Sequence, residues 1–174
     1  MDWTQTLVDV IDFRSFSSLW YWIVLAVVWS SASHWVLGVP FDLIMRARRH
    51  GGQAAADLQD LTRINMGRIL HIAQVSGVWV VAIVTFLLSG LLVLALWYGI
   101  EFAQALLFLA LPMTLVGALG VRAAQSIEGS AAHGEDLVRR LMRHRFWTQV
   151  IGMLAIFATA MYGMYHNLAA LRAW

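Results

Sequence analysis

Two apolar segments separated by only a few residues decide the fold, and they meet in VWVVAIVTFLLSGLLVLALWYGIEFAQALLFLAL, from Val78 to Leu111. Glu101 is the single charged residue in this stretch. The full segments, residues 69–98 and 100–121, are each long enough to cross a hydrocarbon core of about 30 Å at a rise of about 1.5 Å per residue. Because the link around Gly99 is so short, we expect a tight helical hairpin.

Two further apolar segments, residues 17–39 and 146–165, flank this hairpin. Hydrophobic residues make up 60% of the 174-residue chain, and charged residues make up only 13%. A soluble domain of this length needs more charge to cover its surface. The composition therefore predicts an all-α integral membrane protein, a four-helix bundle in which residues 1–174 form a single membrane domain.

The placement of arginine predicts the orientation. All twelve basic residues are arginine, and only Arg14 and Arg172 lie on the side of the chain ends. The other ten lie in the two segments that join the first span to the second and the third to the fourth. The positive-inside rule then predicts both termini outside the cytoplasm, N-out and C-out. We expect a multi-pass protein of the bacterial inner membrane, whose basic segments contact an anionic inner leaflet rather than nucleic acid.

The two arginine-rich segments are similar to each other. LIMRARRHGGQAAADLQDLTRINM (Leu43 to Met66) aligns without a gap to LGVRAAQSIEGSAAHGEDLVRRLM (Leu119 to Met142), with nine identities in 24 positions. We predict two parallel repeats, residues 17–98 and 99–174, after an outer N-terminal segment of residues 1–16. Each repeat is a span, a basic loop with a short amphipathic cytoplasmic helix, and a returning span. The alternative is that two amphipathic loops share only their composition.

The repeat gives equivalent positions to three pairs of charged residues: Arg46 and Arg122, Asp60 and Asp136, and Arg63 and Arg139. We expect each aspartate to form a solvated, weakly stabilising ion pair with the arginine three residues later. Alternatively, each aspartate binds the arginine at the inner end of a span and fixes the loop against the bundle. Small residues also recur at every fourth position on spans three and four, and we expect these two stripes to face each other. The stripes are Ala110, Thr114, Ala118 and Ala155, Thr159, Gly163.

Four polar residues near the cytoplasmic interface are the strongest candidates for a functional site: His34, Asn65, Arg68 and His71. The last three lie within an arc of about 120° on one helix end. In the functional interpretation they line a vestibule open to the cytoplasm, with His34 as its deepest polar group. In the alternative, they form a solvated helix end and His34 packs at the interface beside Trp35.

The chain lacks the patterns of most catalytic sites. It has no Ser/His/Asp arrangement, phosphate-binding loop or metalloprotease motif, and the absence of cysteine excludes thiolate ligands. We therefore expect no enzyme activity, catalytic residue, metal site or cofactor. We favour a non-enzymatic accessory, assembly or scaffold protein that packs through its small-residue helix faces. The alternatives are an oligomeric transporter or channel built from the parallel repeats, and a haem b-binding redox subunit. The partner would be a larger membrane complex or further copies of the chain.

The stretch RSFSSLWYW…WSSASHWVLGVPFD (Arg14 to Asp42), with the arginine-rich loop that follows, resembles a Rhodobacter-like family of small inner-membrane proteins from alphaproteobacteria. The resemblance extends over the whole chain and implies the same location. Some members carry a label that links them to the Suf iron–sulfur assembly complex. A chain without cysteine cannot hold a cluster through thiolates, so the label implies at most a docking role, and it assigns no site residues.

Overall fold

The computed structural model describes residues 16, 19–130 and 132–172 of the chain. This part contains five helices and one short hairpin: α2 (Leu19–His34), β1 (Trp35–Val36), β2 (Val39–Pro40), α3 (Phe41–His50), α4 (Gly52–Leu96), α5 (Glu101–Gly129) and α6 (Gly134–Arg172). The predicted all-α class is confirmed. Of the predicted outer N-terminal segment, residues 1–15 lie outside the described residues.

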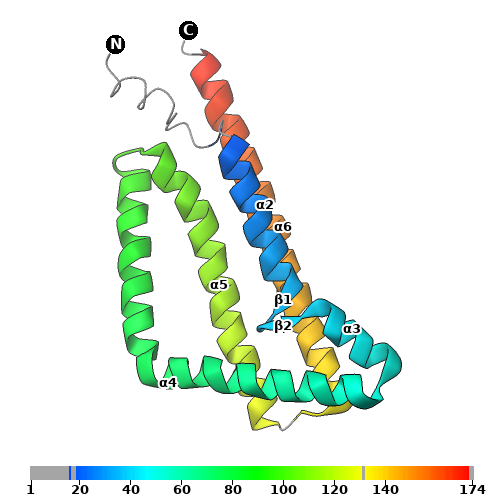
Figure 1. Ribbon diagram of the computed structural model, residues 1–174. Helices are drawn as coiled ribbons and strands as arrows, with labels where there is room; N and C mark the ends of the chain where they lie inside the picture. The colour runs from blue at the N-terminus through cyan, green and yellow to red at the C-terminus, as the bar shows by residue number, and fades with distance from the viewer. Residues whose placement is uncertain (1–15, 17–18, 131, 173–174) are drawn as a thin grey trace, which may run out of the picture.

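The long helix α4 bends and so has two parts. Its first part lies across one end of the molecule together with α3, whereas its second part turns and runs beside α5 (Figure 1). Buried residues recur every fourth position from Leu58 to Leu70 and then stop until Ala95. Helix α4 contains no proline, so it bends at a glycine. The pair Ser76–Gly77 is one such point, because serine–glycine pairs allow a helix to kink. We call residues 35–70 the platform and residues 71–96 the upper limb.

Three helices are long and apolar enough to cross a membrane: Gly52–Leu96, Glu101–Gly129 and Gly134–His166. These contain the second, third and fourth predicted spans. Helix α2 lies beside α6 (Figure 1), but its 16 residues extend only about 24 Å, which is less than the thickness of the hydrocarbon core. Three candidate spans therefore follow from length and composition, and a fourth crossing stays a prediction.

The first predicted span ends earlier than expected. Helix α2 ends at His34, and residues 35–40 form an antiparallel hairpin in which Val36 pairs with Val39. The two residues of its turn, Leu37 and Gly38, have φ of 54° and 79°, as a type I′ turn requires. The unfavourable φ of Leu37 is offset by packing, because this side chain is buried against Gly120 of α5. The hairpin redirects the chain into α3.

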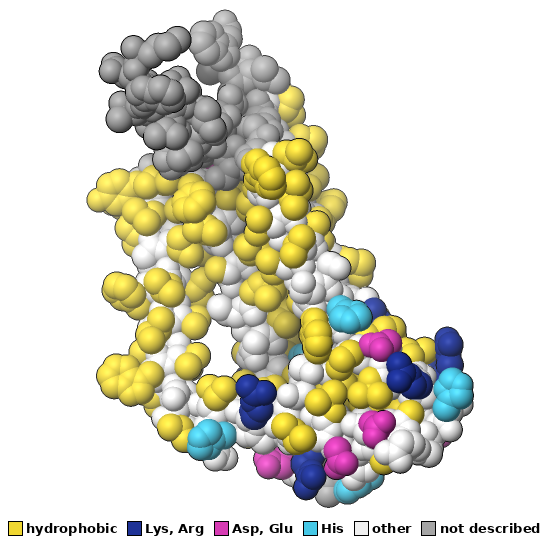
Figure 2. Space-filling model, viewed as in Figure 1, with side chains coloured by type: hydrophobic (Ala, Val, Ile, Leu, Met, Phe, Trp, Pro, Cys, Tyr) yellow, Lys and Arg dark blue, Asp and Glu magenta, His cyan; other side chains and the backbone are white. Residues whose placement is uncertain are grey.

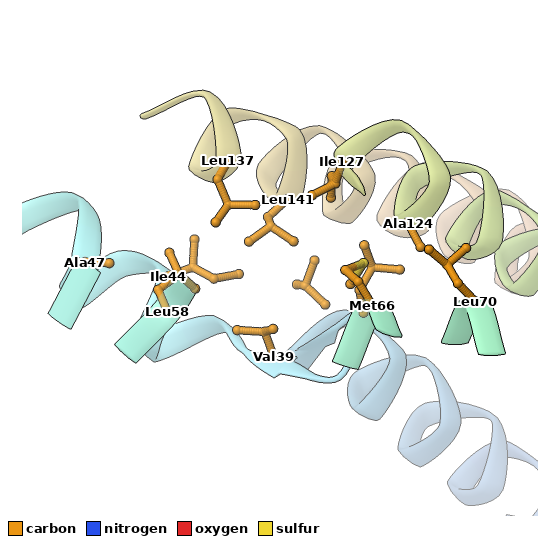
Figure 3. Packing of buried hydrophobic residues seen from close by; sticks show 12 residues of the cluster. Val39, Ile44, Ala47, Leu58, Met66, Leu70, Ala124, Ile127, Leu137 and Leu141 are labelled. Carbon is orange, nitrogen blue, oxygen red and sulfur yellow. The ribbon is translucent and has the colours of Figure 1, made fainter. Parts of the chain in front are cut away.

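The largest hydrophobic core lies in the segments that the sequence assigns to basic loops. Ile44 of α3, Leu58 of α4 and Leu141 of α6 are almost completely buried and point toward one another (Figure 3). Each such side chain contributes about 1.5–3 kcal/mol when it leaves water. Only α3 is a separate short helix, since residues 52–68 are the first part of α4 and residues 134–145 are the first part of α6. The expectation of separate short loop helices is therefore wrong for these two segments, which are parts of a packed layer.

A second, smaller core joins α2 to α5 and α6. Leu25 and Trp29 of α2 pack with Ala155 of α6. The small-residue stripe of α6 is buried. Aromatic side chains pack along the same helix, with Phe16 against Gly163 of the stripe and Trp29 against Gly152, one turn before it. On the predicted partner stripe of α5, Ala110 and Thr114 are half-buried and Ala118 is exposed.

Candidate functional site

The predicted polar cluster does not form a closed site. Asn65 is half-buried and its Nδ2 donates a hydrogen bond to the carbonyl oxygen of Gly38 over 2.9 Å. His34 is exposed, and its ring meets the edge of Trp35 with centroids 5.8 Å apart. Arg68 and His71 are exposed. The structure therefore brings Asn65 to the hairpin that follows His34, and it leaves the other three side chains on the surface.

The contact between Asn65 and Gly38 explains why the sequence turns where it does. A Cβ atom at Gly38 would lie 3.1 Å from both Cγ and Nδ2 of Asn65, in a backbone conformation that already favours glycine. The amide of Asn65 thus replaces water as the donor to a turn carbonyl. This structural contact within the platform is sufficient to explain the position of Asn65.

The repeat-equivalent charges make different contacts in the two halves. Asp60 pairs with Arg63 at 3.4 Å, as predicted, with both side chains at least 70% exposed. Asp136 pairs instead with Arg140 at 2.9 Å, so its predicted pairing with Arg139 is wrong. Neither aspartate binds the arginine at the inner end of a span: Arg46 pairs with Asp42 at 3.7 Å, and Arg122 forms no ion pair among the described residues.

The buried positions of the two segments are also out of register. Leu137 and Leu141 are buried in the second segment, but the residues aligned with them in the first, Leu61 and Asn65, are only half-buried. In the first segment the buried positions are one residue later, at Thr62 and Met66. The two segments share a helix–turn–helix outline without sharing their contacts, and the repeat itself stays a prediction.

Arg145 is the residue that the sequence reasoning missed. Its Nε donates a hydrogen bond to the carbonyl oxygen of Ser33 over 3.0 Å, and its guanidinium lies 3.6 Å from the centre of the Phe41 ring. A cation at the carboxyl end of a helix interacts favourably with the last carbonyls, and stacking on an aromatic face adds to this. Arg145 thereby connects α6 to the end of α2 and the start of α3.

At the other end of the helices, Phe16 has a comparable connecting role. Its backbone N–H donates to Oε1 of Glu101 over 2.8 Å, and its ring makes edge contacts with Tyr21, Phe108 and Tyr162. Glu101, the single carboxylate of the apolar hairpin, therefore accepts a hydrogen bond from the chain just before α2. Together with Arg145, it anchors α2 at both ends.

The upper limb of α4 makes little contact with the rest of the chain. In its most apolar 18-residue stretch only 6% of residues are buried, compared with 22% in α5 and 28% in α6. Every residue from Val78 to Ile83 is exposed. Near the link between α4 and α5 the limb is attached to α5, because Gln104 Nε2 donates to the carbonyl oxygen of Ala95 over 3.0 Å. Between this link and the platform, most of the limb packs against no other helix of the described chain.

The described residues contain no group of three or more side chains suited to holding a metal ion. Comparisons with protein-family models, with curated proteins and with solved structures yield no match. The resemblance to the alphaproteobacterial family stays a prediction.

Proposed function

We propose that the protein is a non-enzymatic scaffold of the bacterial inner membrane. It crosses the bilayer four times with both termini outside the cytoplasm, and its platform lies on the cytoplasmic side. The upper limb of α4 binds a transmembrane helix of a partner protein. The observation that carries this proposal is the long apolar limb that its own chain leaves unpacked.

The surface chemistry of the limb supports a helix as its occupant. Ala82, Thr85 and Ser89 are all exposed and fall within about 60° of one another at 3.6 residues per turn. The half-buried residues near the hairpin, Leu88 and Leu91, lie on another side of the limb. Exposed small residues three and four positions apart allow close approach of a second helix in lipid, where packing replaces the hydrophobic driving force.

The charge distribution supports the orientation. Dark blue arginine side chains gather around the platform, whereas the coloured side chains on the visible face of the helices above it are mostly hydrophobic (Figure 2). Ten of the twelve arginines belong to the platform or to the ends of α5 and α6 that pack on it. Placing this end in the cytoplasm satisfies the positive-inside rule and sets the basic side chains against anionic headgroups.

Site-specific photo-crosslinking in native membranes tests the proposal. A photoreactive phenylalanine analogue replaces Phe86, which lies beside the small-residue stripe and is 77% exposed. The matched control carries the analogue at Phe157 of α6, which is 64% exposed. We expect a discrete adduct with another protein from position 86 only. Ser89→Leu should weaken this adduct because it fills the stripe, and Val80→Leu, on a different side of the limb, should leave it unchanged.

The other outcomes overturn the proposal. An adduct between two copies of the chain would show that the limb forms a homo-oligomer, the form expected of a small transporter, and not a complex with another protein. Lipid adducts alone at both positions would show that the bilayer covers the limb and that no partner helix docks there.

A further inference from the structure

Two cavities follow one another along the pair formed by α5 and α6, and we call them together the groove. One part, with a volume of about 210 Å³, borders the platform, and the other, of about 390 Å³, lies farther along the two helices. On α5 the lining includes Phe108, Leu111, Leu115, Leu119, Arg122 and Ser126. On α6 it includes Arg140, Arg143, Trp147, Ile151, Leu154 and Ala158. Spacings of three and four residues keep each set on one face of its helix, so the two cavities lie in line along the same side of the helix pair.

The end of the groove next to the platform is strongly basic. Arg122, Arg140 and Arg143 line it beside the half-buried His144, and no carboxylate among the described residues does so. Arg140 is held in place, because its Nε donates to Asp136 over 2.9 Å and its Nη1 donates to Ser126 Oγ over 2.8 Å. Arg122 and Arg143 are exposed and form no ion pair within the described part of the chain. Two guanidinium groups are thus available to an anion from outside.

The rest of the groove is apolar. Its lining from Leu107 to Leu115 on α5 and from Ile151 to Ala158 on α6 contains only hydrocarbon side chains. From Arg122 to Phe108 the groove follows fourteen residues of α5, or about 21 Å at helical rise. This exceeds half of the hydrocarbon core, about 15 Å, and therefore accommodates an acyl chain of one leaflet. Trp147, which is 52% exposed, lies where the basic and apolar parts meet, as interfacial tryptophans do.

We propose that this groove is a specific site for one anionic phospholipid of the leaflet next to the platform. The phosphate lies between Arg122 and Arg143, which match its oxygens through paired N–H donors, and an acyl chain occupies the apolar part. A zwitterionic lipid binds less well, because its ammonium group meets arginines and finds no carboxylate in the lining. Basic pockets between membrane helices on the cytoplasmic side have this selectivity in general. The site does not depend on the scaffold role of the upper limb.

Native mass spectrometry of the purified full chain tests the proposal, with phosphatidylglycerol and phosphatidylcholine of identical acyl chains as ligands. We expect phosphatidylglycerol to bind about tenfold more tightly, because both lipids carry the phosphate and only phosphatidylcholine brings an ammonium group that the arginines repel. The double variant Arg122→Gln/Arg143→Gln should lose this preference. Its matched control, Arg49→Gln/Arg68→Gln, removes two exposed arginines of the platform and should retain it.

Two further measurements separate a lipid site from a general anion site. Ala158→Phe fills the apolar part without touching the arginines and should weaken phosphatidylglycerol binding severalfold. Inorganic phosphate at the same concentration should not displace the lipid. Equal binding of the two lipids by the unmodified chain, an equal loss in both double variants, or displacement by inorganic phosphate would each overturn the proposal.

Discussion

The contact between Gly152 and Trp29 gives the most specific prediction about how α2 is held. A Cβ atom at position 152 would lie 2.7 Å from Cε3 of Trp29 and 3.2 Å from Cδ2 and Cζ3. The Trp29 ring is only 4% exposed and belongs to the second core, so it has little room to move. Gly152→Ala should therefore force α2 away from α6.

The magnitude follows from two opposing effects. Overpacking a buried contact of this kind costs about 1–3 kcal/mol, whereas replacing glycine by alanine within a helix contributes about 0.5–1 kcal/mol of stabilisation. We expect a net loss of about 0.5–2 kcal/mol. In a chain of this size such a loss lowers the midpoint of thermal unfolding by a few degrees.

The assay is thermal unfolding of the detergent-purified protein, with Gly117→Ala as the matched control. Gly117 is also within a long apolar helix, but a Cβ atom there would meet nothing within 4 Å, so this variant should be neutral or slightly more stable. Adding Trp29→Phe to Gly152→Ala should recover part of the loss, because the smaller ring relieves the clash. Trp29 Nε1 has no hydrogen-bond partner among the described residues, so the change sacrifices none. If the two alanine variants unfold at the same temperature, the close packing of α2 on α6 is refuted.

Substitutions at four further positions test the platform and the ends of α5 and α6 that pack on it, by the same unfolding assay. Arg145→Gln should cost about 1–2 kcal/mol, because it loses both the hydrogen bond to α2 and the aromatic stacking; Arg145→Lys should rescue little, and full rescue would show that charge alone matters. Asn65→Ala should cost about 0.5–1.5 kcal/mol by removing the donor to Gly38, whereas a silent variant would mean that water replaces the amide. Asp60→Asn should be nearly neutral, and Asp136→Asn should be clearly worse because its arginine is held in a network; equal losses would favour the repeat as a true structural equivalence.

The all-α class and three helices long and apolar enough to cross a membrane could be predicted from the sequence, because they depend on the length of apolar runs. The β1–β2 hairpin could not be predicted, since Val36, Leu37 and Val39 continue the apolar run in composition. Gly38 and Pro40 were the signals of a turn. The core of the platform was missed for a related reason. An amphipathic helix on a membrane surface and one that packs on protein have the same periodicity.

The contacts of single polar residues were even less accessible to the sequence. Arg145 counts as one more cytoplasmic charge, yet its hydrogen-bond partner lies 112 residues away along the chain. The groove on α5 and α6 likewise becomes visible only when the two helices are placed side by side, so that its basic and apolar parts lie in line. Asn65 was one of the candidate residues, and its contact is with the turn after His34 and not with the His34 side chain.

The central claim is that the helices are embedded in a membrane with the platform on the cytoplasmic side. The chain contains no cysteine, so single introduced cysteines report accessibility without background. Gln53→Cys marks the platform, and Tyr98→Cys marks the hairpin between α4 and α5; both positions are exposed. With intact spheroplasts, a membrane-impermeant maleimide should label Tyr98→Cys at once and label Gln53→Cys only after lysis. The reverse pattern, or labelling of both positions before lysis, would contradict the account.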